Sequence, residues 1–150
     1  MEEHKGNFWN TYVFSTDHKM IAKQYLITGL IMALVGGFMA YIFRMQLAYP
    51  GQSVPLFGEV SGSAYNSLIT LHGTVMVFWV GMPILLGAFG NFLIPLMIGA
   101  DDMAFPTLNM LSYWTFFLST IVLFISFIVP DGPAASGWTA YPPLSARSDY

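Results

Sequence analysis

The stretch "SLITLHGTVMVFWVGMPILLGAFGNFLIPLMIGA", residues 67–100, decides the fold class of this chain. It contains no Asp, Glu, Lys or Arg, and His72 is its one ionisable side chain. Because a bilayer-spanning helix needs about 20 mostly apolar residues, this stretch is predicted to cross a membrane. As one helix it would extend about 50 Å against a hydrocarbon core of about 30 Å, so it must tilt, project beyond the core or break. Pro83 and Pro95 are the expected kink and end.

Two further segments, residues 24–43 and 103–130, also lack Asp, Glu, Lys and Arg. Hydrophobic residues make up 55% of the 150 residues and charged residues 9%, whereas about 25% of the residues in soluble domains are charged. The sequence therefore predicts an all-α membrane protein with three transmembrane helices, at about residues 24–44, 64–98 and 108–130. We expect the lipid bilayer as its surrounding and no nucleic-acid partner.

Lysines that precede the first span predict the orientation of the chain. They are Lys5, Lys19 and Lys23. Because positive side chains favour the cytoplasmic side of a membrane, we expect the N-terminus in the cytoplasm. In that orientation Arg44 and the tail from Pro130 lie outside, and the turn with Asp101 and Asp102 lies inside.

His72 is the strongest candidate functional residue, because an ionisable side chain within a span is costly. Neutral imidazole is a good ligand for iron or copper, but His72 could also relay protons or bond to a neighbouring helix. One histidine cannot complete a metal site, and His4 and His18 are expected on the opposite side of the membrane. A metal at His72 would therefore need a macrocycle, or ligands from outside this chain.

Other polar residues near the predicted membrane boundaries leave two interpretations open. Arg44 ends the first span, where a cation favours the helix C-terminus or could bind a carbonyl or carboxylate of a cofactor. Asp101 and Asp102 could start a helix or a turn. With Asn91 near the end of the second span, they could also line a water-filled mouth for protons.

Ordered motifs along nearly the whole chain resemble one known family. They are "FSTDHKMI" (14–21), "FRMQLAYPG" (43–51), "LHGTVMVFWVGMP" (71–83), "GNFLIPLMIGADDMAFPTLN" (90–109) and "GWTAYPPLSA" (137–146). The chain resembles the N-terminal portion of haem-copper oxidase subunit I, of the cytochrome c oxidase type. The resemblance implies that residues 1–150 are a fragment of a bundle of roughly twelve helices.

The resemblance also implies roles near the outer side. His72 matches an axial ligand of the low-spin haem A, Arg44 lies at the haem's formyl group, and Trp138 lies near its propionates. A haem with two imidazole ligands has no open position, so it transfers electrons and does not bind oxygen. The high-spin haem and the copper are expected from parts of the subunit outside this chain, which cannot reduce oxygen by itself.

On the inner side the resemblance implies the mouth of the D proton pathway. The matching residues are Asp102, Asn91, Asn109, His18 and Tyr25. Three positions depart from the family pattern: Asp101 stands where proline is frequent, and Thr107 and Met110 replace a common Arg and Asn. Gln46 replaces an acid beside an outer cation site, so that site is not expected.

The implied function is the reduction of O2 to water with electrons from cytochrome c, coupled to proton pumping. Quinol-using relatives carry polar residues where this chain has Val35, Met39, Ala64 and Ser67, which favours cytochrome c as donor. A quinol oxidase, or a truncated scaffold or assembly subunit without catalysis, is the alternative. The expected partners are the remaining helices of subunit I, oxidase subunits II and III, and cytochrome c, in a bacterial cytoplasmic membrane.

Overall fold

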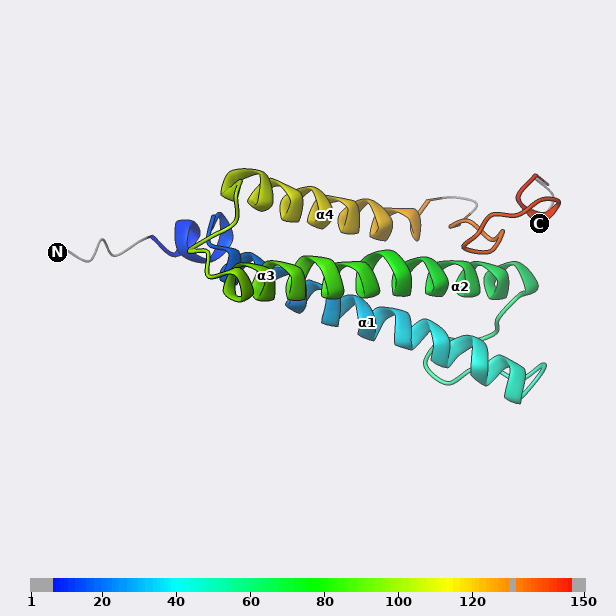
Figure 1. The fold of residues 1–150 in the computed structure, drawn as a ribbon. Helices are drawn as coiled ribbons and strands as arrows, with labels where there is room; N and C mark the ends of the chain where they lie inside the picture. The colour runs from blue at the N-terminus through cyan, green and yellow to red at the C-terminus, as the bar shows by residue number, and fades with distance from the viewer. Residues whose placement is uncertain (1–6, 130–131, 147–150) are drawn as a thin grey trace.

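The computed structural model describes residues 7–129 and 132–146, and this part is mostly helical, with no β-strand. His4, Lys5 and Pro130, which the predicted orientation involves, lie outside these described ranges. Helix α1 covers His18–Ala48, and α4 covers Pro106–Ser126. Between them one continuous helix covers Gly62–Ile98. These three helices are long and apolar enough to cross a membrane, which confirms the predicted fold class (Figure 1).

The middle helix has four consecutive parts. They are α2 (Gly62–Thr74), η2 (Val75–Gly81), η3 (Pro83–Gly90) and α3 (Asn91–Ile98). In η2 and η3 the hydrogen bonding is of the π type: the N–H of Met82, for example, donates to the carbonyl of Val77, five residues back. The helix passes through Pro83 without a break. Of the expected tilt, projection beyond the bilayer core and break, the break is therefore excluded. Its 37 residues would measure about 55 Å at α-helical rise, and the helix must tilt or project beyond the bilayer core.

The expectation that Pro95 ends this helix is wrong, because the helix continues to Ile98. Gly99 ends it, with a φ of 69° in the left-handed region that glycine adopts without steric cost. The N–H of Ala100 then donates to the carbonyl of Pro95 at 2.9 Å. Pro95 has no N–H to donate to the carbonyl of Asn91, four residues back, and that carbonyl instead accepts a hydrogen bond from Nδ1 of His18 at 2.8 Å.

Local capping explains where each of the three long helices begins. The Asp17 carboxylate accepts a hydrogen bond from the N–H of Lys19 at 2.9 Å at the start of α1. The Ser61 hydroxyl accepts one from the N–H of Ala64 at 3.2 Å at the start of α2. Helix α4 begins with Pro106, whose missing N–H would be unpaired in the first turn anyway.

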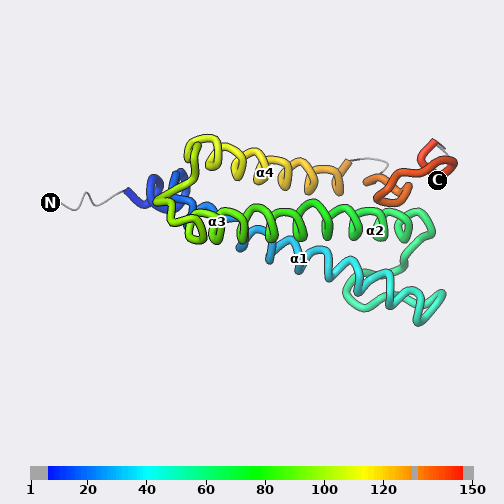
Figure 2. Tube along the Cα trace, in the orientation of Figure 1, coloured from blue at the N-terminus to red at the C-terminus, as the bar shows by residue number. Residues whose placement is uncertain are grey.

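The three long helices run up, down and up, and the chain thereby forms two distinct ends (Figure 2). The start of α1 and the turn between α3 and α4 form one end, called here the α3 end. The other end, called the α2 end, holds residues 49–61, the start of α2 and residues 132–146. Two short helices, η1 (Trp9–Val13) and η4 (Leu144–Ala146), lie at the α3 end and the α2 end respectively.

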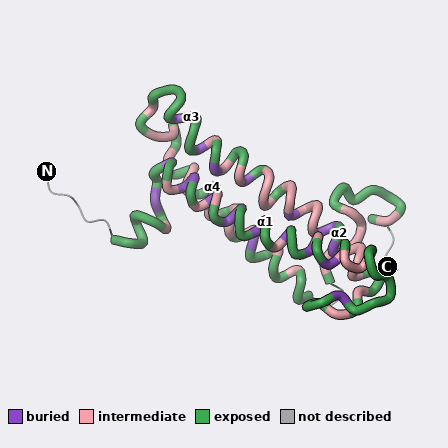
Figure 3. Tube along the Cα trace, turned by 90° about the horizontal axis from the view of Figure 1, so that it is seen from below, coloured by how far each residue is buried: buried purple, intermediate pink, exposed green. Residues whose placement is uncertain are grey.

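Buried residues gather in two clusters, one toward each end. The cluster toward the α2 end comprises Met39, Ile42, Val54, Leu68 and Leu71. The cluster toward the α3 end comprises Ile21, Tyr25, Ala88 and Tyr113. Elsewhere exposed residues follow the helices along most of their length (Figure 3), and many are large apolar side chains. Such surfaces suit contact with lipid or with further helices.

Candidate functional site

His72 lies in the last turn of α2, and its ring is oriented by the backbone of α1. Its Nδ1 atom is 2.9 Å from the carbonyl oxygen of Gly36. Because a carbonyl only accepts hydrogen bonds, Nδ1 must carry the proton and donate. In the neutral ring the lone pair is then on Nε2, which has no hydrogen-bond partner among the described residues. This is how a protein commonly orients a metal-ligating histidine.

Two neighbours allow and define this contact. A Cβ at Gly36 would lie 2.8 Å from the sulfur of Met76 and 3.4 Å from Cγ1 of Val75, so a larger residue there would have to displace these side chains of the middle helix. The Phe43 ring lies edge-on to the imidazole, with the ring centroids 5.4 Å apart. The His72 ring is thus held by α1 both at Gly36 and at Phe43.

Trp138 comes from a distant part of the chain and packs against the turn of α2 that carries His72. A Cβ at Gly73 would lie 2.8 Å from Cδ1 of the Trp138 indole. The segment is held there because the N–H of Gly137 donates to the Thr70 hydroxyl at 2.9 Å. The fold therefore brings Trp138 beside the residue that follows His72.

Arg44 lies at the same level but does not join this group. It follows Phe43, which contacts the His72 ring, and its own side chain is exposed. Among the described residues, Arg44 makes no hydrogen bond to His72 or Trp138. No three His, Asp or Glu side chains in the described part approach one another closely enough to hold a metal ion.

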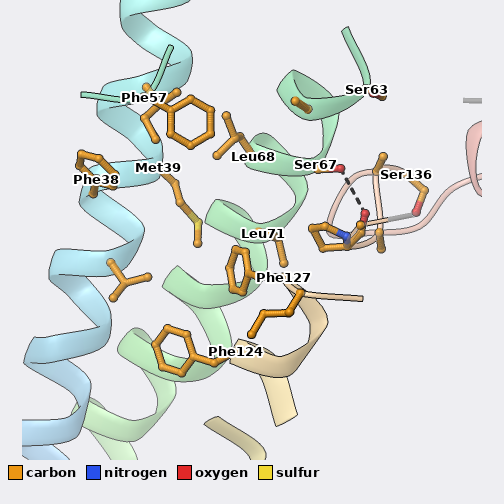
Figure 4. Close-up of a pocket in the computed structure, with 18 of the residues that line it drawn as sticks. Phe38, Met39, Phe57, Ser63, Ser67, Leu68, Leu71, Phe124, Phe127 and Ser136 are labelled. Carbon is orange, nitrogen blue, oxygen red and sulfur yellow. Dashed lines mark hydrogen bonds between the residues drawn. The ribbon is translucent and has the colours of Figure 1, made fainter. Parts of the chain in front are cut away.

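A cavity of about 1000 Å³ lies between α1, α2, α4 and the segment 132–145 (Figure 4). All four positions that are polar in quinol-using relatives line it, namely Val35, Met39, Ala64 and Ser67. Phenylalanine and leucine side chains form much of the remaining wall. The Ser67 hydroxyl already donates to the carbonyl of Pro133 at 3.1 Å. No charged side chain from the described residues lines this cavity.

At the α3 end, the fold brings Asp102, His18 and Asn91 together. The Asp102 carboxylate accepts hydrogen bonds from the N–H of Met103 at 2.7 Å and from the N–H of His18 at 3.3 Å. The buried His18 ring donates from Nδ1 to the carbonyl of Asn91 at 2.8 Å. Asp101, by contrast, is exposed. The two adjacent acids therefore differ: Asp102 connects the α3–α4 turn to the start of α1.

Tyr25 and Asn109 are joined through Ser112, which the sequence analysis missed. The Ser112 hydroxyl lies 2.6 Å from the carbonyl of Asn109 and donates to it. Its single proton is then used, so the Tyr25 hydroxyl, 3.0 Å away, donates to the Ser112 oxygen. Ser112 follows Asn109 by three residues, and this spacing on one helix face was the available signal. The Nδ2 atom of Asn109 is buried without a partner among the described residues.

Comparison with known proteins shows the family of this chain. A family described as "Cytochrome C and Quinol oxidase polypeptide I" matches residues 20–150. The chain is 46% identical to an alternative cytochrome c oxidase subunit 1 of Bradyrhizobium diazoefficiens, over 97% of this chain and 24% of that protein. It is 44% identical to a cytochrome c oxidase subunit 1 of Alkalihalophilus pseudofirmus, over 99% of this chain and 22% of that protein.

A third relative is a heme-copper oxidase subunit I+III of Aeropyrum pernix, with 43% identity over 91% of this chain and 16% of that protein. The chain therefore spans at most about a quarter of the length of these relatives. The family match over residues 20–150 includes nearly all of α1, the middle helix, α4, the turn with Asp102 and the segment with Trp138. The chain belongs to the family of cytochrome c and quinol oxidase polypeptide I, the membrane subunit I of haem-copper oxidases.

Proposed function

We propose that this chain is the part of an oxidase subunit I that supplies a low-spin haem A ligand and the mouth of a proton pathway. The whole enzyme would reduce O2 to water with electrons from cytochrome c and pump protons. The single observation that carries the proposal is the hydrogen bond from Nδ1 of His72 to the Gly36 carbonyl. It leaves Nε2, the atom that would bind iron, unprotonated in the neutral ring.

The residues around His72 fit a haem. A haem with two imidazole ligands transfers single electrons. The carbonyl of Gly36 makes the imidazole a stronger electron donor, which favours the oxidised iron. Arg44 has an exposed and permanently charged guanidinium, suited to a formyl oxygen. Trp138, which packs against the turn of α2 that carries His72, has an indole N–H that can only donate, and this suits a propionate.

The residues at the α3 end fit proton uptake. Asp102 is only partly buried and so meets water, while its hydrogen bonds fix its position. The buried, unpartnered amide of Asn109 is a donor for which water is a suitable partner. The Ser112 hydroxyl, which donates to the backbone carbonyl of Asn109, and the Tyr25 hydroxyl extend from α4 toward α1. In this proposal His18 and Asn91 position the mouth through the hydrogen bond between them.

Cytochrome c is favoured over quinol as the donor because of the cavity between α1, α2 and α4. Of the four positions compared with quinol-using relatives, only Ser67 carries a hydroxyl, and it already donates to the carbonyl of Pro133. The described residues that line the cavity supply serine hydroxyls but no charged or amide side chain for a quinol head group. The proposal includes oxidase subunits II and III as partners, and a bacterial cytoplasmic membrane with the N-terminus in the cytoplasm.

The test is the optical spectrum of the oxidase complex that contains this chain. His72→Ala should abolish the low-spin haem A band. Thr74→Ala is the matched control, because Thr74 is on the same helix and its hydroxyl only bonds to the carbonyl of Thr70. If the band survives in His72→Ala, the ligand assignment is wrong. If the unaltered complex carries no haem band, the chain is a scaffold without catalysis.

A further inference from the structure

One glycine of the middle helix contacts two of the residues proposed for proton uptake. A Cβ at Gly87, in η3, would lie 2.6 Å from both Cγ and Cδ1 of the Tyr25 ring. The carbonyl oxygen of Gly87 also accepts a hydrogen bond from Nδ2 of Asn91 at 2.7 Å. Gly87 therefore lies between Tyr25 on α1 and Asn91 at the start of α3.

The Tyr25 ring is enclosed on its other sides, so it cannot easily move away from Gly87. Phe116 stacks on it, with centroids 5.4 Å apart and the planes at 28°. Tyr113 meets it edge-on, with centroids 5.2 Å apart and the planes at 81°. The Tyr113 hydroxyl shares a hydrogen bond of 3.1 Å with Thr28, one turn along α1. Close packing of this kind transmits a displacement rather than absorbing it.

A side chain at position 87 would meet the base of the ring, because Cγ is its point of attachment. The end of a flexible side chain could rotate aside, but Cγ of Tyr25 moves only if the whole ring or α1 moves. Such a movement would separate the Tyr25 hydroxyl from Ser112, which it contacts at 3.0 Å.

We propose that Gly87 is a positioning residue for proton uptake, which by lacking a side chain keeps the Tyr25 hydroxyl on Ser112. This inference rests on the proposed function of the α3 end. A glycine that only permits helix packing would affect assembly and stability. A positioning glycine affects the rate of proton uptake in an enzyme whose haem is intact.

Gly90 supplies the matched control, because it lies in the same helical segment, three residues after Gly87. A Cβ at Gly90 would meet only Ile94 and the carbonyl of Leu85, both at 3.9 Å, which is an ordinary contact distance. Alanine changes the intrinsic helix propensity equally at the two positions. A difference between the Gly87→Ala and Gly90→Ala variants therefore reports the contact with Tyr25.

The experiment uses the oxidase complex in vesicles and records turnover, protons taken up per electron, and the low-spin haem band. Gly87→Ala should slow turnover about tenfold, as displaced groups do in other sites, and lower proton uptake with the haem band unchanged. Gly90→Ala should match the unaltered complex. In a Tyr25→Ala background, where space is released, adding Gly87→Ala should have little further effect.

Two results would overturn the inference: Gly87→Ala behaves like Gly90→Ala, or its effect is as large without the Tyr25 ring as with it. If the Gly87→Ala complex does not assemble, the Phe116→Leu variant is used instead, because it loosens the Tyr25 ring from the opposite side. Proton uptake should also fall in that variant. Unchanged proton uptake in Phe116→Leu contradicts the inference. The Asp102→Asn variant distinguishes a failure of the proposed function from a failure of the inference about Gly87. If it leaves proton uptake intact, the proposed function fails. If it slows uptake while Gly87→Ala does not, only the inference fails.

Discussion

The Nδ1 atom of His72 lies 2.9 Å from the carbonyl oxygen of Gly36, and this hydrogen bond joins the last turn of α2 to the middle of α1. It determines which ring nitrogen carries the proton, because a carbonyl cannot donate. It also depends on the missing side chain of Gly36, against which Met76 packs. A change at Gly36 is therefore expected to alter the chemistry of His72 without removing the proposed ligand.

Gly36→Val should raise the midpoint potential of the low-spin haem. A valine side chain there must displace Met76 and crowds Val75 of the middle helix, so α1 is expected to shift, the hydrogen bond to lengthen and the imidazole to donate less electron density to iron. A net hydrogen bond contributes about 1 kcal/mol, which corresponds to a rise of about 40 mV for one electron. Gly37→Val is the control, since a Cβ at Gly37 has no neighbour within 4 Å. Redox titration measures both, and equal potentials would contradict the role of Gly36.

Asp102→Asn should slow turnover and stop proton pumping far more than Asp101→Asn. The Asp102 carboxylate contacts the start of α1 through the N–H of His18, whereas Asp101 is exposed. The asparagine oxygen still accepts those hydrogen bonds, so the fold remains while the ionisable group is lost. Proton release from vesicles after addition of oxygen is the measurement. Equal effects of the two substitutions would show that Asp102 is not the site of proton uptake.

Reduced cytochrome c, and not quinol, should support turnover. The Ala64→Phe variant tests the cavity directly, because Ala64 is one of the residues that line it. A bulky ring there should leave oxidation of cytochrome c unchanged. Oxygen consumption with each donor is measured in both proteins. Turnover with quinol that disappears in Ala64→Phe would instead identify this cavity as a quinol site.

Gly99→Ala should destabilise the protein by about 1 kcal/mol, because alanine at a positive φ is strained. The glycine has a φ of 69° at the end of α3, and its open surroundings exclude a steric contribution from neighbours. Gly37→Ala, in the interior of α1, should stabilise it by about 0.5–1 kcal/mol through helix propensity. Thermal unfolding in detergent should therefore shift in opposite directions. Shifts of the same sign would contradict this account of the helix end.

The three helices followed from local pattern. Runs without charge predicted the helices because each backbone polar group in a bilayer must be satisfied within its own segment. Pro95 was misread, since a proline within the last turn leaves its carbonyl available for the bond from Ala100. Ser112 and Gly87 were missed because their roles depend on Tyr25, which lies far away in the sequence.

By itself the sequence determined the class of protein, the number of apolar helices and the residues that carry the family resemblance, because charge and hydropathy act within one segment. It also singled out His72, since one ionisable side chain in an apolar run is unusual. Only the tertiary structure decided which nitrogen of His72 carries a proton, which of two adjacent acids meets α1, and which glycine meets Tyr25. Each of these depends on the distance between separate helices, which packing of side chains sets and composition does not.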